Sequence, residues 1–407
     1  MRGQIIASID VGSSNVRVAV CEYSRKDGTF SVRALAKVPS DGLKNGYIVN
    51  PDAVTASIGN ALREAERTVG ERIKRAIVSV GGVGLGTVID VGTVAISRAD
   101  SLVSDFDIDR LLQEAEARIG ERPNTRILHA IPSEYKVDGR KILGKPGGYS
   151  GNKLEQKTTF ITAAAPHLDA LVKSVEDSGV EVQEVYAAPI AESMVTTTAT
   201  ARNAGTLVAN IGAQTVSMLT IEDGLPTSLK VFPLGSTDIT HDIALGLRIP
   251  LEAAESIKIN GEQEKKNLKR VSEITEARLS DIFELIDTHL KKIGRSGLLP
   301  AGVVFTGEGA HTKGLENLGR RQLGLPVKIA RNSIPDELTA VGTDEGASGK
   351  NIARMRERLE KARGPEWSTA LGLCVLGMSA APEESLGIRM ARKTKNSLMG
   401  FLKQFLP

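Results

Sequence analysis

The sequence predicts an α/β protein built from two similar halves, each a mixed sheet flanked by helices, that face each other across a cleft. Two observations predict this fold class. The segment IDVGSSNVRVAV (residues 9–20) aligns without a gap on ANIGAQTVSMLT (209–220), at an offset of 200 residues, with a glycine at the same place in both turns. Both segments also open the same order of elements, β-β-β-α-β-α-β-α, which favours a duplication over two unrelated hairpins.

The first half is expected to begin with three strands. We place them from residue 4, at 15–22 and at 30–38. A helix follows from the Asn50-Pro51 start to about Val69, because proline is favoured at the first helical position. The half then continues with a strand at 76–82, a helix at 166–179, the strand VEVQEVYA and a helix from Pro189. The excursion at about 84–163 interrupts this order and is expected to be an insertion.

The second half is expected to repeat the order. We place its elements as strands at 205–211, 215–221 and 227–233, a helix near 235–247, an excursion, a strand at 302–307, a helix near 311–323 and a strand at 326–330. A last helix at 367–378 follows a polar stretch at 335–364.

Composition and charge exclude several classes of function. The net charge is only +3 over 407 residues, and no basic run is interleaved with aromatic residues, so no nucleic-acid partner is expected. Cys21 and Cys374 lie in apolar stretches, as buried free thiols do in a reducing cytoplasm. The five histidines lack ligand spacing, and no apolar run approaches the roughly 20 residues that span a bilayer. The first residues run into a strand pattern, without the features of a signal peptide.

The turn of the first repeat has the residue types that hold a phosphate. Gly12 lets the backbone approach a phosphate oxygen, while Ser13, Ser14 and Asn15 add backbone and side-chain donors. Asp10, at the end of the strand, is placed to hold Mg²⁺ through water, because hard cations prefer oxygen ligands. An ordinary exposed turn remains the alternative, since so short a motif is weak evidence.

Three further segments complete the expected nucleotide site. The second turn and the turn after strand 302–307 contribute Asn210, Gly212, Ala213, Gln214, Thr215, Gly307, Glu308 and Gly309. In AAESIKING, Glu255 and Lys258 lie at i and i+3 on one face of an expected helix, where they could reach a ribose and base. They could equally form an ordinary surface ion pair.

Five longer segments resemble the FtsA family of bacterial cell-division proteins, which belongs to the actin, Hsp70 and sugar-kinase superfamily. They are RILHAIPSEYKVDG (126–139), GYSGNKLEQKTTFIT (148–162), PLGSTDITHDIALGLRIPLEAAESIKI (233–259), VVFTGEGAHTKGL (303–315) and STALGLCVLG (368–377). The resemblance covers nearly the whole chain and implies an actin-like fold, with duplicated ribonuclease-H-like domains around a nucleotide cleft and an inserted α+β subdomain, 1C. It implies subdomain 1A at 1–83 and 164–204, 1C at 84–163, 2A at 205–248 and 301–334, 2B at 249–300, a connecting segment and closing helix at 335–380, a linker at 381–394 and a membrane-targeting helix at 395–407.

Within the insertion, DFDIDRLLQEAEARIG (105–120) has its apolar residues on one helical face, and two strands are expected after it. No catalytic set is recognisable there. The family resemblance implies contacts with other subunits and division proteins, and a structural lid is the alternative.

The end of the chain is basic and amphipathic. After Glu384 there is no acidic residue. A helix there would carry an apolar face beside lysines and would lie in the headgroups of an anionic membrane. The residues concerned are Lys395, Leu398, Met399, Phe401, Leu402, Lys403, Phe405 and Leu406. Docking of this helix on the protein's own core is the alternative.

The resemblance implies a function. Members of this family anchor FtsZ filaments to the cytoplasmic face of the inner membrane at the division site, self-assemble, recruit downstream divisome membrane proteins, and bind ATP or ADP with Mg²⁺. It implies that the FtsZ C-terminal tail binds subdomain 2B, with Arg278 as a candidate contact.

Several residues depart from the family pattern. The aspartate usual in the second turn is Asn210, two usual glycines are Ala213 and Gln214, and Glu308 stands where glycine is common. The connection 187–189 lacks the glutamate that orients water in hydrolysing relatives, and Glu192, one turn on, is a poor substitute. We therefore expect no catalytic residue and a nucleotide that is a structural ligand with little or no hydrolysis. Weak or absent nucleotide binding is also open.

Two other functions share this fold. A phosphotransferase of the sugar-kinase type needs a carboxylate base at the acceptor hydroxyl, and Asp10 is the one candidate. A pilus-assembly actin homologue would not need a basic amphipathic terminus.

Overall fold

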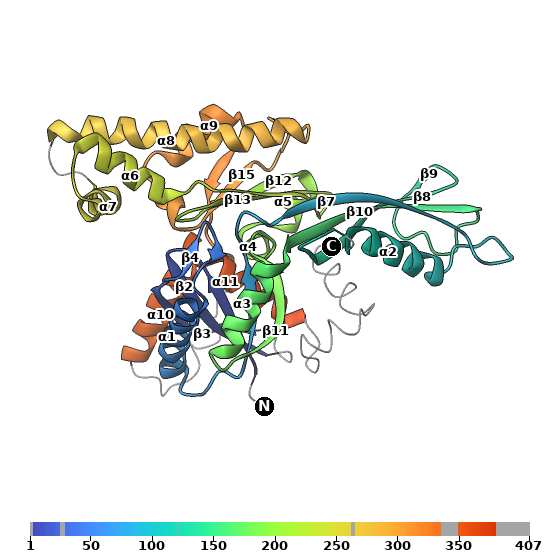
Figure 1. Cartoon of the computed structure of the whole chain (residues 1–407), viewed down its shortest axis with the longest axis horizontal. Coiled ribbons are helices and arrows are strands. Elements are labelled where there is room, and N and C mark those ends of the chain that lie inside the picture. The colour runs from blue at the N-terminus through green and yellow to red at the C-terminus, as the bar shows by residue number, and fades with distance from the viewer. Residues whose placement is uncertain (1–2, 25–28, 121, 262–264, 335–348, 380–407) are drawn as a thin grey trace.

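The computed structural model describes residues 3–24, 29–120, 122–261, 265–334 and 349–379 of the chain (Figure 1). The described elements form two five-stranded sheets, a four-stranded sheet and a small hairpin of β4 (Leu43–Lys44) and β5 (Tyr47–Ile48). The predicted linker and membrane-targeting helix, 381–407, lie outside the described residues. None of the helices in the described part of the chain is long and apolar enough to cross a bilayer.

The first half is built on a mixed sheet in the order β11-β6-β1-β2-β3. Its strands are β1 (Gln4–Val11), β2 (Asn15–Ser24), β3 (Thr29–Pro39), β6 (Arg75–Val80) and β11 (Glu181–Ala187). In β2, the residues from Val16 to Cys21 are buried without alternation, which requires that both faces of the sheet be covered. The helices that pack along it are α1 (Pro51–Val69), α3 (Ala165–Asp177), α4 (Ala188–Thr196), α10 (Gly349–Ala362) and α11 (Ser368–Ser379).

Helix α1 begins and ends where the sequence predicts. The side chain of Asn50 accepts a hydrogen bond from the backbone N–H of Ala53 at 3.2 Å, and Pro51 occupies the first turn. The helix ends at Gly70, whose φ of 85° is the left-handed conformation that glycine adopts without strain.

The second half repeats the first. Its sheet has the order β14-β13-β12-β15-β16. The strands are β12 (Thr206–Ile211), β13 (Val216–Glu222), β14 (Leu225–Phe232), β15 (Val303–Thr306) and β16 (Val327–Ile329). Asp10 pairs with Arg17 in the first hairpin and Asn210 with Ser217 in the second, so the offset of 200 residues holds in three dimensions. This register confirms the predicted duplication.

Helices cover this second sheet as well. They are α5 (Ala199–Ala204), α6 (Ser236–Leu247), α7 (Leu251–Asn260), α8 (Lys265–Lys292) and α9 (Leu315–Leu323). Figure 1 shows α8 along the top edge of the molecule, beside α6 and α9. Helix α4 of the first half contacts β12 and β13, so it lies between the two sheets.

The insertion forms a separate arm that extends away from both halves (Figure 1). It consists of β7 (Gly86–Ala95), α2 (Asp105–Gly120), β8 (Thr125–Val137), β9 (Arg140–Ile142) and β10 (Lys153–Ala164), with the sheet order β7-β10-β8-β9. The predicted helix is confirmed, but three strands follow it rather than two. The short β9 was missed because it is half of a tight hairpin around Asp138 and Gly139, both at positive φ.

Two expectations in the second half are corrected. The helix expected near 311–323 is split into η1 (Glu308–His311) and α9, because Gly314 adopts a φ of 86° between them. The stretch 335–364 was expected to be simply polar, yet its second part forms α10, which packs on β3. The short η4 (Pro365–Trp367) then leads into α11.

Candidate functional site

The two glycine turns face each other and line one cavity. In the first turn the N–H of Gly12 donates to the carbonyl of Asn15 at 3.1 Å, and in the second the N–H of Gly212 donates to Thr215 at 2.9 Å. The cavity between them measures about 110 Å³. Ligand pockets usually measure roughly 300–1,000 Å³. The cavity is therefore small for a nucleotide.

Most of the predicted nucleotide residues line this cavity. They are Asp10, Gly12, Ser13, Ser14, Asn15, Asn210, Gly212, Ala213, Thr215, Gly307 and Glu308. Gly307 and Gly309 permit close packing, because a Cβ at Gly307 would lie 2.4 Å from Asn210 Oδ1, and one at Gly309 would lie 2.3 Å from the Ile211 side chain. Gly309 thus supports the loop from outside the lining.

Three other predicted residues also lie outside the lining. Gln214 accepts a hydrogen bond from the N–H of Asn45 at 2.8 Å and so ties the second turn to the β4–β5 hairpin. Glu255 and Lys258, on α7, pair with each other at 2.7 Å, and the Lys258 ammonium donates to the Thr240 hydroxyl at 2.8 Å. Glu255 and Lys258 thus form the ordinary ion pair that the sequence analysis gave as the alternative to a contact with ribose and base.

Glu192 is the main lining residue that the sequence interpretation set aside. It lies on α4 and its side chain is fully buried. Its carboxylate accepts hydrogen bonds from the Asn210 amide at 2.6 Å, the Thr306 hydroxyl at 2.8 Å and the Thr369 hydroxyl at 2.9 Å. Burial raises the pKa of Glu192 to about 7, although these three donors oppose the rise. A sequence signal existed, because Glu192 is the lone charged residue of an apolar helix.

Asp10 and Arg17 share the floor of the cleft. The Ser79 hydroxyl donates to Asp10 Oδ1 at 2.7 Å, and the Arg17 guanidinium lies 3.7 Å from Asp10 Oδ2. Burial raises the pKa of Asp10, with Arg17 and Ser79 acting in the opposite direction. Arg17 was missed, although the hairpin register opposite Asp10 could have indicated it.

Glu308 closes the cleft from the other side. It follows β15 in the second half and reaches β2 and β3 of the first. Arg17 donates to its Oε1 at 2.6 Å, Lys37 pairs with the same oxygen, and the Asn15 amide lies 3.3 Å from both oxygens. We call these four residues the cleft clasp. Burial would raise the pKa of Glu308, but Arg17 and Lys37 outweigh burial and hold that pKa below its ordinary value.

The lining residues do not fit the expected Mg²⁺ ion. Among the described residues no group of three or more histidine, cysteine, aspartate or glutamate side chains could hold a metal. Asp10 already has the Arg17 cation beside it, and the second turn offers the neutral amide of Asn210. A divalent cation next to a guanidinium would be repelled. The donor set suits a phosphate better than a metal.

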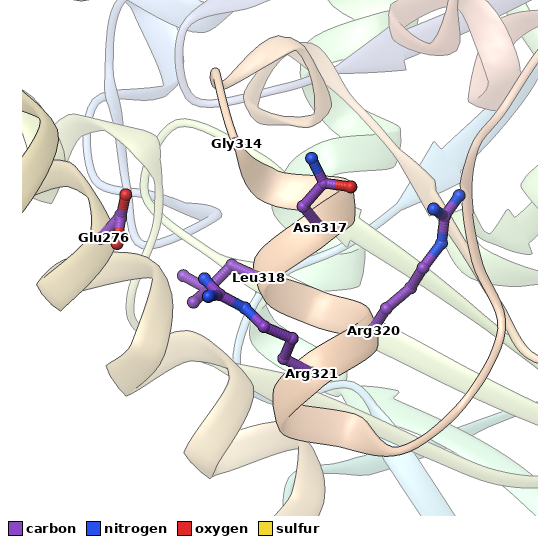
Figure 2. Close-up of a pocket in the computed structure, with 6 residues that line it drawn as sticks. All are labelled: Glu276, Gly314, Asn317, Leu318, Arg320 and Arg321. Atoms are coloured by element: carbon purple, nitrogen blue, oxygen red, sulfur yellow. The ribbon is translucent and has the colours of Figure 1, made fainter.

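A second hollow, of about 550 Å³, lies between α8 and α9 (Figure 2). Its lining residues are Glu276, Gly314, Asn317, Leu318, Arg320 and Arg321. Figure 2 shows Leu318 and Arg321 pointing toward α8, while Arg320 points to the other side of α9. Arg278, the predicted partner contact, lies two residues after Glu276 on α8, where Asp242 at 2.6 Å and Asp281 at 3.2 Å already bind its guanidinium.

Comparison with known proteins identifies the family. The family model described as "Cell division protein FtsA" matches residues 207–372, and the model "SHS2 domain inserted in FTSA" matches residues 86–162. The cell division protein FtsA of Bacillus subtilis is 30% identical over 83% of this chain and 82% of its own length. The chain belongs to the FtsA family of cell-division proteins. The relative from Pseudomonas aeruginosa is 28% identical, covering 96% of this chain and 92% of its own.

Solved structures agree on the actin-like fold. A chain of a PilM-PilN type IV pilus biogenesis complex has a TM-score of 0.65 at 18% identity, covering 93% of this chain and 99% of its own. The ethanolamine utilization protein EutJ from Carboxydothermus hydrogenoformans has a TM-score of 0.52 at 16% identity, covering 91% and 89%. At such identities the likeness concerns the fold alone, so it does not favour the pilus-assembly alternative.

Proposed function

We propose that this chain is an actin-like adaptor that anchors FtsZ filaments to the cytoplasmic face of the cell membrane at the division site. The observation that carries the proposal is the basic amphipathic segment 395–407 at the end of a chain that belongs to the FtsA family. Filament formation through copies of the same chain and recruitment of downstream division proteins belong to the same proposal.

The anchor is proposed from the chemistry of its side chains. Phe401, Leu402 and Phe405 can enter the acyl boundary, while Lys395 and Lys403 remain at the headgroups. Each basic residue near an anionic surface contributes on the order of 1 kcal/mol of attraction.

Sedimentation with vesicles tests the anchor. The intact chain is expected to pellet with vesicles that contain anionic lipid and to stay in the supernatant with purely zwitterionic ones. A chain that ends at Glu384 and the variant Phe401→Asp should both lose pelleting, while Arg72→Gln, an exposed site in the first half, should keep it. Equal pelleting of the intact and shortened chains would remove the anchor and favour docking on the protein's own core.

The FtsZ tail is proposed to bind the hollow between α8 and α9. A C-terminal peptide offers carboxylates. Arg321 is exposed and forms no ion pair with another described residue, so its charge can meet a ligand. Arg278, bound by Asp242 and Asp281, is better suited to hold α8 against α6 than to grip a peptide.

Peptide titration tests this site. Arg321→Glu is expected to weaken binding of an FtsZ tail peptide by at least about tenfold, the effect of losing one charge-assisted hydrogen bond. Arg72→Glu, far from the hollow, should bind like the unmodified chain. If both variants bind equally well, the tail docks elsewhere.

Nucleotide is proposed to be a structural ligand of the cleft, hydrolysed slowly if at all. Support comes from Asn210, a neutral amide that cannot take a proton, and from Glu192, whose carboxylate is already held by three donors. Turnover is measured as phosphate release from ATP by the full chain. A rate comparable to that of an ordinary kinase, on the order of 1–100 per second, would contradict this role.

A further inference from the structure

Arg17 is the one cationic side chain among the described residues that line the cleft. It projects from β2, its side chain is 9% exposed, and its guanidinium lies between the carboxylates of Asp10 and Glu308. The equivalent position in the second repeat is Ser217, so the duplication does not account for an arginine here.

The two carboxylates against Arg17 are already paired. Asp10 and Glu308 face the cations Arg17 and Lys37. Of the other lining carboxylates, Glu192 accepts from three neutral donors and Glu366 pairs with His311. Mg²⁺ is usually bound through one or two carboxylates together with substrate phosphates, and here Asp10 already lies against the Arg17 cation. A guanidinium instead presents several N–H donors in a plane that matches the oxygens of a phosphate.

Glu308 occupies the place that a phosphate would take. Its carboxylate is an anion held by Arg17, Lys37 and the Asn15 amide, and it enters the cleft from the opposite half of the molecule. While it is bound there, the cavity is only about 110 Å³. A phosphate that binds Arg17 and Lys37 competes with this carboxylate for the same donors.

We propose that Arg17 supplies the positive charge for the phosphates of a nucleoside di- or triphosphate in place of a divalent cation, and that Glu308 is the internal anion those phosphates displace. The proposal rests on nucleotide binding as part of the proposed function. Two consequences follow. Binding is independent of Mg²⁺, and removal of the Glu308 charge strengthens it because Arg17 and Lys37 are then free for phosphate.

The test is isothermal titration of the full chain with ATP, once in excess Mg²⁺ and once in EDTA. The dissociation constants of the unmodified chain are expected to agree within about threefold. Glu308→Gln is expected to bind at least about tenfold more tightly and Arg17→Met at least about tenfold more weakly, the effect of gaining or losing one charge-assisted contact. Arg33→Met is the matched control, because Arg33 lies on β3 in an exposed pair with Glu22, away from the cleft, and should change nothing.

Each other outcome decides against the proposal in a distinct way. Affinity that falls tenfold or more in EDTA overturns it but leaves nucleotide binding in place. Unchanged affinity in a folded Arg17→Met overturns it and makes the clasp a purely structural contact. If neither the unmodified chain nor Glu308→Gln binds ATP, both this proposal and the nucleotide part of the proposed function are overturned. The membrane anchor is tested separately by vesicle pelleting. If Arg17→Met does not fold, the EDTA comparison and Glu308→Gln decide alone.

Discussion

Replacing Glu192 by glutamine is expected to change how the stability of the protein depends on pH. Glu192 is fully buried between the two halves, and its burial raises its pKa from an ordinary 4.5 to about 7. Between these two pH values the native protein keeps a proton that the unfolded chain has released. The contribution of Glu192 is therefore most favourable below pH 4.5 and is lost as the pH rises toward 7.

The size of the effect follows from the two pKa values. One pKa unit corresponds to about 1.36 kcal/mol, so the difference between a pKa of 4.5 and one of about 7 corresponds to roughly 3 kcal/mol of unfolding free energy. Most of this is lost between pH 5 and pH 8. Glu192→Gln keeps the shape of the side chain but has no proton to lose. Relative to the unmodified chain, it should gain roughly 2–3 kcal/mol when the pH is raised from 5 to 8.

Urea unfolding at pH 5, 6, 7 and 8 measures this difference. Trp367, the one tryptophan in the chain, is buried two residues before Thr369, a partner of Glu192, so its fluorescence reports on this region. Glu71→Gln, at an exposed position, is the control and should keep the pH dependence of the unmodified chain. Asp10, whose pKa is also raised, contributes equally to the unmodified chain and to Glu71→Gln. In Glu192→Gln the repulsion between the two carboxylates is removed, which changes the pH dependence in the same direction. An unchanged pH dependence in Glu192→Gln would refute the reasoning.

Three further predictions concern stability. Asn210→Asp should destabilise the protein more at pH 8 than at pH 6, as measured by urea unfolding. The change places a second carboxylate against Glu192, to which the Asn210 amide now donates at 2.6 Å. Equal losses of unfolding free energy at both pH values would contradict this. Asp107→Ala should lower the free energy of unfolding in urea by about 1–3 kcal/mol. The reason is that the fully buried Asp107 carboxylate accepts from two backbone N–H groups and a serine hydroxyl. A loss within 0.5 kcal/mol, typical of surface changes, would contradict this. Gly372→Ala should lower the free energy of unfolding by at least about 1–3 kcal/mol and lower the melting temperature, because the added Cβ would lie 1.8 Å from a carbonyl oxygen of α4. Gly120→Ala is the control and should be neutral, since nothing lies within 4 Å of its added Cβ. Equal melting temperatures of the two variants would contradict this.

The sequence alone was sufficient for the duplicated fold and for about half of the cleft lining. Runs of β-branched residues, glycine positions and helix caps are local signals, so the three-strand openings of both halves and the limits of α1 could be read directly. The aligned turns also indicated that Gly12 and Gly212 would face one cavity, because a duplicated unit places equivalent turns in equivalent places.

Tertiary structure alone decided which side chains meet in the cleft. Arg17 and Glu308 are 291 residues apart in the chain, and Glu192 and Thr369 are 177 apart. No local pattern encodes such pairs, because they depend on how two sheets and the helix between them pack. That packing made Glu308 the closing contact of the cleft. It also gave Glu192, the lone charge of α4, three hydrogen-bond donors in a fully buried position. The sequence by itself thus determined which turns line the cleft, and only the folded chain decided which charges occupy it.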